Sequence, residues 1–153
     1  MREKKTTFLN FKHTRGDAQQ KQMEQIAQDG VCPFCREHFE KYHNSPIEEE
    51  GEWWVVTKND YPYDGTSAHY LLVYKLHATN VTEVDQEAWV EFGRFVSMLN
   101  EKHAPNGGAV FMRFGDMDYT GSSVAHLHAQ FLVGGPHSED AEKLRVKLGY
   151  KKR

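Results

Sequence analysis

The chain has 153 residues, 39% of them hydrophobic and 12% aromatic, and its formal net charge is −3. This length suits a single domain, and the apolar content is enough for an ordinary globular core, which excludes a disordered or fibrous chain. Because acidic and basic residues are interspersed, the basic face of a dedicated nucleic-acid-binding protein is not expected.

The first half of the chain predicts two helices followed by two strands. A thin apolar stripe that ends at a glycine predicts a mostly polar surface helix over residues 17–29. A short helix is expected over 36–42. Runs rich in aromatic and β-branched residues predict strands over 53–57 and 69–75, joined by a loop over 59–66 that is rich in turn residues.

The second half predicts one long helix and two more strands. Apolar residues at helical spacing predict a core-facing helix that begins at Thr82 or Asp85 and ends near residue 103. Strands are expected over 109–114 and 124–133, with a polar loop between them. A last helix, capped at its start and basic toward its end, is expected to follow the second of these strands.

These elements together predict an α+β fold. Most strands are joined by loops without regular β-α-β alternation, which favours an antiparallel sheet with a long central helix and short flanking helices. We expect one domain over residues 1–153, with a core at roughly 30–135. An N-terminal helix and a C-terminal helix, the latter starting at Ser138, are appended to that core.

Three polar side chains alternate along the last predicted strand. In a strand, His126, His128 and Gln130 project from one face, while the apolar residues between them face the core. Three aligned polar groups on an apolar strand cost free energy unless something binds them. The strand is therefore the first candidate for a functional site.

A short loop just before this strand adds to the candidate site. It contains Gly121, Ser122 and Ser123. Glycine permits close approach of a ligand, and successive backbone N–H groups with hydroxyls can hold an anion such as phosphate. A Gly-Ser turn alone is common, but beside His-x-His-x-Gln it indicates a phosphate site.

The chain has only two cysteines, Cys32 and Cys35, in the run Cys-Pro-Phe-Cys. No apolar run approaches the roughly 20 residues of a membrane span, and the first residues are polar and charged, so we expect a cytoplasmic protein without membrane association. In a reducing compartment the pair indicates a metal or redox site. A redox site would follow a strand, whereas a polar helix precedes this pair, which favours tetrahedral zinc.

The run from Gly121 to Gln130, followed by Phe-Leu-Val-Gly-Gly, resembles the signature of the histidine triad (HIT) superfamily. The run from Asn59 to His77 is similar to the upstream block of that superfamily: an Asn, a Pro-Tyr pair, and a strand between two histidines. The resemblance covers roughly residues 32–135. Most hydrolase members carry a third His where this chain has Gln, and His-x-His-x-Gln resembles the galactose-1-phosphate uridylyltransferase and dinucleoside-polyphosphate phosphorylase branch.

The resemblance implies a nucleotidyl transferase or hydrolase that acts on a nucleotide phosphoester or dinucleoside polyphosphate through a covalent nucleotidyl-histidine. It implies that His128 is the nucleophile, that Gln130 contacts the phosphoryl oxygens and that His69 is the other active-site histidine. The implied substrate contacts are Gly121, Ser122 and Ser123 for phosphate, with Asn59 and Asp64 for the nucleoside. The implied ligands of a structural zinc are Cys32, Cys35, His77 and His126.

Two other functions stay open at this point. One is a hydrolase in which Gln130 is a tolerated variation, and the other is a zinc-braced nucleotide-binding module without turnover. A homodimer is implied by the resemblance only. The base, the leaving group and the acceptor (water, phosphate or a sugar phosphate) are undetermined. The remaining histidines are interpreted as surface or capping residues: His13, His38, His43, His103 and His137.

Overall fold

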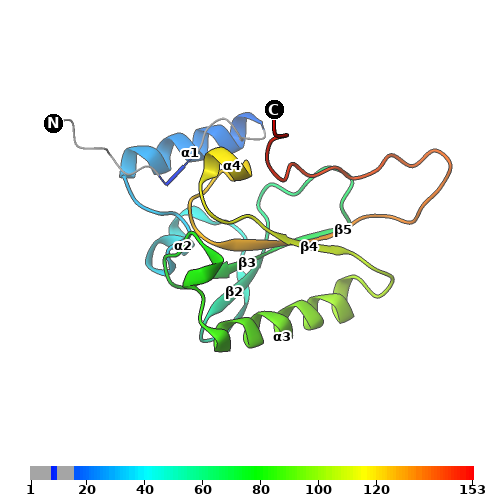
Figure 1. Ribbon diagram of the computed structural model, residues 1–153, viewed down its shortest axis with the longest axis horizontal. Helices are drawn as coiled ribbons and strands as arrows, with labels where there is room; N and C mark the ends of the chain where they lie inside the picture. The colour runs from blue at the N-terminus through cyan, green and yellow to red at the C-terminus, as the bar shows by residue number, and fades with distance from the viewer. Residues whose placement is uncertain (1–7, 10–15) are drawn as a thin grey trace.

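In the computed structural model, which describes residues 8–9 and 16–153, an antiparallel sheet lies between two layers of helices (Figure 1). The five strands of the sheet run in the order β1-β2-β3-β5-β4 within these residues. The strands are β1 (Ile47–Glu50), β2 (Trp54–Lys58), β3 (Ala68–Tyr74), β4 (Ala109–Met112) and β5 (His128–Val133). The helices are α1 (Asp17–Asp29), α2 (Arg36–Tyr42), α3 (Gln86–His103) and α4 (Met117–Thr120), with a 3₁₀ turn, η2, at Val81–Glu83. The predicted α+β class is confirmed.

The larger part of the core lies between the sheet and α3. Alternate side chains of three central strands, among them Trp54, Leu72 and Ala129, are fully buried there. The predicted apolar stripe of α3 packs against them, and Leu99 is its most buried member. Trp54 also donates a hydrogen bond from its indole nitrogen to the carbonyl oxygen of Ala88, at 2.7 Å. This face of the sheet is therefore packed with apolar side chains.

The opposite face of the sheet is covered by α1 and α2. Phe39 of α2 packs on Val55, Leu71 and Val73. The helix predicted over 17–29 is confirmed, and it buries a narrow apolar edge rather than a full face. This thinner cover leaves space between α1 and the sheet.

A bond between α3 and the β1–β2 turn gives the first testable prediction. The Glu91 carboxylate accepts hydrogen bonds from the backbone N–H groups of Glu52, Trp53 and Trp54, each at 2.8 Å. Glu91→Ala removes this acceptor from three donors, so we expect the free energy of unfolding to fall by about 2 kcal/mol in urea denaturation. Glu101→Ala, at an exposed position of the same helix, should change it by less than about 0.5 kcal/mol. Equal losses in the two variants would contradict this role.

Several elements differ from the sequence expectation. The strand expected over 109–114 ends at Met112, and the polar loop expected after it contains the short helix α4. The acidic run before the second strand forms β1, an edge strand whose residues alternate between half-buried and exposed. The last strand begins at His128 and not at Val124, because the preceding backbone bonds elsewhere. The Leu127 N–H donates to Ala78 O, and Val124 forms only an isolated bridge with Leu9.

The predicted C-terminal helix is wrong. Residues 134–153 contain no helix, and they run back in extended form toward α4 (Figure 1). Leu144, Val146 and Leu148 alternate with charged residues, a spacing that suits an extended chain. The Arg113 guanidinium bonds the carbonyl oxygen of Lys147, which ties the segment to the end of β4.

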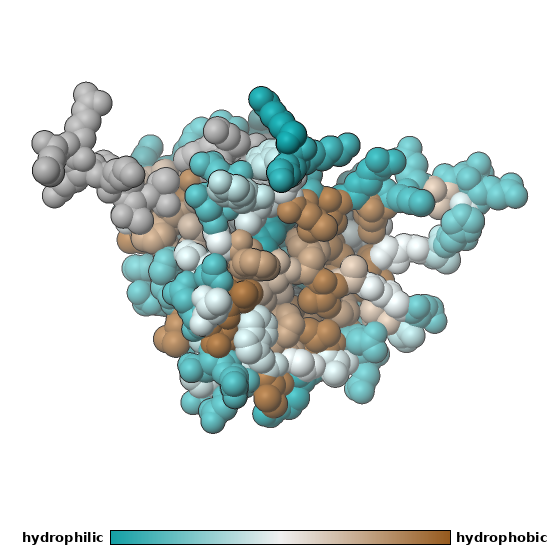
Figure 2. Space-filling model, viewed as in Figure 1, coloured by the Kyte–Doolittle hydropathy of each residue, from teal (hydrophilic) through white to brown (hydrophobic). Residues whose placement is uncertain are grey.

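The other edge of the sheet is apolar and exposed. On β4, Val110 is 39% exposed, and Phe114 just after the strand is 52% exposed. Val90 of α3 is also exposed. Figure 2 shows apolar side chains gathered on the face seen in the view of Figure 1.

Among the described residues, no helix is both long and apolar enough to cross a membrane.

Candidate active site and metal cluster

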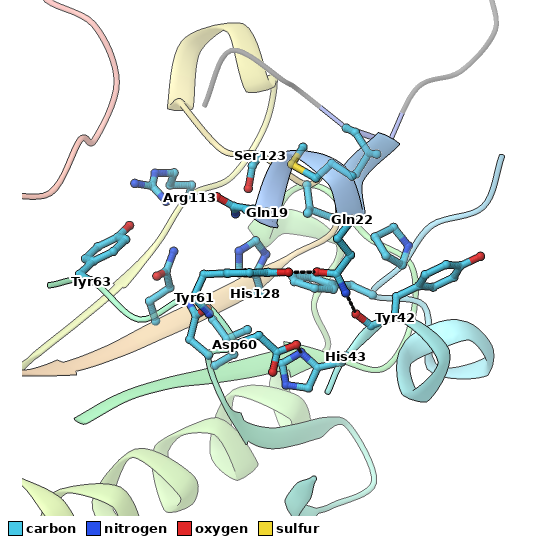
Figure 3. A pocket seen from close by; sticks show the side chains of 18 of the residues that line it. Gln19, Gln22, Tyr42, His43, Asp60, Tyr61, Tyr63, Arg113, Ser123 and His128 are labelled. Carbon is cyan, nitrogen blue, oxygen red and sulfur yellow. Dashed lines mark hydrogen bonds and ion pairs between the residues drawn. The ribbon is translucent and has the colours of Figure 1, made fainter. Parts of the chain in front are cut away.

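A cavity of about 260 Å³ lies between the sheet, α1 and the C-terminal segment (Figure 3). Its floor includes Leu71 of β3 and His128 and Gln130 of β5, and α1 contributes Gln19 and Gln22 to its wall. This is the space that the narrow apolar edge of α1 leaves open. The cavity therefore contains the centre of the predicted histidine motif.

His128 is held in one tautomer by its own strand. Its Nδ1 lies 2.6 Å from the carbonyl oxygen of His126, so Nδ1 carries the proton and donates it to that oxygen. The lone pair then resides on Nε2. The ring of Phe34 meets the ring of His128 at 89°, with centroids 4.9 Å apart. These two contacts fix the imidazole in the cavity with a nucleophilic nitrogen.

Gln130 is oriented by a hydrogen bond from His69, which lies outside the cavity lining. The backbone N–H of Tyr63 donates to His69 Nδ1 at 3.1 Å, so the ring proton is on Nε2. That nitrogen lies 2.7 Å from Gln130 Oε1 and donates to it. His69 is 4% exposed and is not among the residues that line the cavity, whereas Gln130 is. His69 is thus a positioning residue, and the bond directs the amide nitrogen of Gln130 away from it.

The two serines of the predicted phosphate loop have different positions. Ser123 lines the cavity, as does Gly121, which ends α4 in the left-handed conformation with φ of 73°. Ser122 is buried outside the cavity, and its hydroxyl donates to the carbonyl oxygen of Val124 at 3.0 Å. Only Ser123 can offer its hydroxyl to a ligand, because Ser122 stabilises the turn.

Of the two predicted nucleoside contacts, only one lines the cavity. Asn59 lines the cavity, and its Oδ1 accepts the N–H of Tyr61 at 2.8 Å. Asp64 is exposed and does not line it, whereas Asp60, which sequence reasoning missed, does. Asp60 follows β2, and its oxygens accept from the backbone N–H groups of the α2–β1 loop.

His43, expected to be a surface or capping residue, occupies the C-cap position of α2, but its side chain is buried. Its side chain is 6% exposed, and Nδ1 lies 3.4 Å from Asp60 Oδ2. The opposite nitrogen, Nε2, lies 2.8 Å from Thr57 Oγ1. Burial lowers the pKa of His43, and the Asp60 charge opposes that shift. No motif marks this pair, because its two members are brought together by the sheet. His13 lies outside the described residues.

Four predicted ligands come together beside this cavity. Cys32 Sγ, Cys35 Sγ and the Nδ1 atoms of His77 and His126 all lie within 4.8 Å of one another. The two Nδ1 atoms are 3.3 Å apart, and the nearest sulfur–nitrogen distances are 3.3 and 3.4 Å. A zinc tetrahedron with ordinary bond lengths has nitrogen–nitrogen and sulfur–nitrogen edges of about 3.3 to 3.6 Å. The donor set and its spacing therefore fit tetrahedral zinc.

The protonation chemistry of the cluster fits a metal better than a redox pair. Burial raises the pKa of Cys35 to about 12 and also raises the pKa of Cys32. A reactive thiol needs a lowered pKa. Burial lowers the pKa of His126 to about 4, and its Nε2 donates to Tyr74 O at 2.6 Å, which leaves the lone pair of Nδ1 facing the cluster, where it can bind a metal.

Several residues of the cavity lining belong to no motif that the sequence predicted as functional. Phe34 lies between the two cysteines in the sequence, and its ring contacts His128. Arg113 and the C-terminal residues Arg145 and Lys147 also line the cavity. Their alternation with apolar residues could have indicated an extended segment, but nothing local indicates which part of the molecule it crosses.

The chain was compared with known proteins. No family model and no curated protein matches it. It is similar in structure to a HIT family hydrolase from Clostridium thermocellum, with 24% identity over 74% of this chain and 96% of that chain and a TM-score of 0.55. A Zn-bound histidine triad family protein from Mycobacterium smegmatis has 18% identity, covers 76% of this chain and 83% of its own, and has a TM-score of 0.53.

A third solved structure gives the same result. A histidine triad protein from Clostridium difficile has 18% identity over 72% of this chain and 96% of that chain, with a TM-score of 0.53. At these identities the likeness concerns the fold. The chain has the histidine triad fold, as the motif predicted.

Proposed function

We propose that this protein is a histidine triad nucleotidyl transferase or hydrolase that acts on a nucleotide phosphoester or dinucleoside polyphosphate. The observation that carries this proposal is the hydrogen bond from His128 Nδ1 to His126 O, because in the neutral ring it leaves the lone pair on Nε2 at the cavity. The structural neighbours include proteins named as a HIT family hydrolase and as a hypothetical histidine triad nucleotide-binding protein, which supports the same class.

The reaction proceeds in two steps. The Nε2 lone pair of His128 forms a bond to phosphorus, and the bond from phosphorus to the leaving oxygen breaks with its electron pair on that oxygen. The Nδ1–H bond to the His126 carbonyl stabilises the positive ring. An acceptor oxygen then attacks phosphorus, the nitrogen–phosphorus bond breaks, and the acceptor proton passes to solvent. This sequence regenerates the neutral imidazole.

The neighbours of His128 have distinct roles. The Gln130 amide donates to a phosphoryl oxygen, and the Ser123 hydroxyl donates to another. Because an amide transfers no proton to the leaving group, leaving groups that are stable as anions are favoured. A phosphate chain is such a group, which favours a dinucleoside polyphosphate. Asn59 and Asp60 contact the nucleoside.

The four-ligand cluster holds zinc in this proposal. A Zn-bound neighbour and the spacing of the donor atoms support that identity. With four protein ligands, zinc supplies a structural crosslink and no open coordination position. Cys32 and Cys35 then hold Phe34 against His128, which keeps the nucleophile in place.

A homodimer is the proposed assembly. The exposed apolar residues on the edge strand β4 and on α3, described above, support it (Figure 2), because such an edge invites pairing with a second chain. Sedimentation equilibrium should give a mass of two chains. Val110→Lys, which puts a charge on the β4 edge, should shift that mass toward one chain.

The reaction type can be tested by product analysis with and without inorganic phosphate. A phosphorylase requires phosphate and releases a nucleoside diphosphate, whereas a hydrolase releases a nucleoside monophosphate in its absence. If neither a dinucleotide nor a nucleotide ester is consumed under either condition, the protein is better described as a nucleotide-binding module without turnover.

The bond from His69 to Gln130 gives a prediction for a positioning residue. His69→Ala releases the Gln130 amide without removing any group that lines the cavity, so we expect kcat to fall by about 10- to 100-fold with KM changed less than threefold. Steady-state kinetics measure both constants. His103→Ala is the matched control, because His103 stacks on Tyr70 and neither residue lines the cavity. A rise in KM with kcat unchanged would contradict the role.

A further inference from the structure

The cavity carries more positive charge than one phosphate requires. Arg113, Arg145 and Lys147 line it, and Asp60 is the one carboxylate among the described lining residues. The chain as a whole has a net charge of −3, so this is a local excess of cations in a slightly acidic protein. Cations gathered in a concave site concentrate anionic ligands there.

Arg113 and Asp60 lie toward different ends of the cavity. In Figure 3, Arg113 and Ser123 lie toward one end, Asp60 and His43 lie toward the other, and His128 lies between them. Asp60 is already engaged by His43 and by two backbone N–H groups. Because His128 lies between the two ends, a nucleotide bound with its nucleoside toward Asp60 would place the group on the other side of its phosphorus atom near Arg113.

The C-terminal segment is fixed where it meets the cavity. Arg113 Nε and Nη2 donate to the carbonyl oxygen of Lys147, at 3.0 and 2.5 Å. Leu144 packs against Gly134, where an added Cβ would lie 2.9 Å from Leu144 Cδ1. A guanidinium has five N–H groups, so one edge of Arg113 can hold the segment while its remaining nitrogen faces a ligand.

We propose that Arg113 and Arg145 form a subsite for a second phosphoryl group, beyond the one that His128 attacks. This inference rests on the proposed function. The group is either the next phosphate of a polyphosphate leaving group or an inorganic phosphate acceptor, and both have the same recognition chemistry. Guanidinium groups suit it because they bind phosphate oxygens through charge-assisted, bidentate hydrogen bonds.

Binding of inorganic tripolyphosphate to the zinc-loaded full chain tests the subsite without any turnover. By isothermal titration at fixed ionic strength, Arg145→Ala should weaken tripolyphosphate binding about tenfold. Lys143→Ala removes the same charge from the same segment at an exposed position outside the cavity lining, and it should change the affinity less than twofold. Equal effects of the two variants, or none, would overturn the subsite.

Kinetics then separate the two sources of the phosphate. For a leaving-group site, Arg145→Ala raises KM for a dinucleoside tetraphosphate when no inorganic phosphate is present. For an acceptor site, it raises KM for inorganic phosphate instead. No change in either constant overturns the proposal. Failure of the proposed His128 chemistry can be distinguished from failure of the proposed subsite. A protein that forms no adduct can still be titrated with tripolyphosphate.

Discussion

Replacement of His128 by alanine is expected to abolish both turnover and the covalent intermediate. After incubation with dinucleoside polyphosphates or nucleotide sugars, intact-protein mass spectrometry of the wild type should reveal a mass increase equal to one nucleotidyl group. His128→Ala should give none, and kcat should fall by about 10⁴-fold or more, because a nucleophile cannot be replaced by its neighbours. The size of the increment identifies the nucleotide.

The conditions of this experiment follow from the chemistry of the adduct. A phosphorus–nitrogen bond to imidazole hydrolyses when the ring is protonated, so samples are kept mildly alkaline before analysis. His103→Ala, whose ring stacks on Tyr70 outside the cavity, is the control and should form the adduct. An adduct that persists in His128→Ala would refute the assignment of the nucleophile. A wild type without adduct or turnover would favour the nucleotide-binding module.

Loss of the metal cluster is expected to have the largest effect on stability. Elemental analysis should find one zinc per chain, and Cys35→Ser should lose it and lower the Tm by about 10 °C or more. The reason is that a bound zinc would join the segment between α1 and α2 to His77 and His126, which are distant in the sequence. Loss of the metal would remove this crosslink and leave only the contacts among the four side chains themselves.

The pH dependence of zinc retention follows from the same residues. Burial raises the pKa of both thiols, so a proton competes strongly with the metal for each sulfur. We therefore expect zinc to be released as the pH falls, and the Tm to fall with it. His38→Ala, a partly exposed neighbour outside the cluster, should retain zinc and Tm. A zinc-free Cys35→Ser protein with unchanged Tm would show that the cluster is not structural.

The same variants address the redox alternative. A thiol redox pair would react rapidly with disulfide reagents in the protein as isolated, and it would hold no metal. The raised pKa of Cys35 opposes such reactivity. We expect slow thiol modification until zinc is removed by a chelator, measured as the rate of reaction with an aromatic disulfide.

The sequence by itself determined the elements and the chemistry of the central motif. Hydrophobic periodicity predicted α3 and the central strands because each of these elements buries a continuous apolar stripe. The spacing of His128 and Gln130 is local, so their common face on β5 was predictable. His126 was expected on the same strand face, but it lies just before β5 and joins the metal cluster, where the resemblance had placed it. Two other features were less well predicted: the charged edge strand β1 and the extended C-terminal segment, neither of which buries a continuous apolar stripe.

The tertiary structure alone decided which polar residues face the cavity. Ser122 and Ser123 are neighbours with identical side chains, yet one bonds its own loop and the other faces the ligand space. Asp60 rather than Asp64 lines the cavity because β2 and the α2–β1 loop enclose it with His43. Arg113 and Arg145, 32 residues apart in the sequence, line the same cavity because a hydrogen bond to a backbone carbonyl ties the chain end to the end of β4. Such contacts depend on the packing of distant segments, which local sequence patterns do not encode.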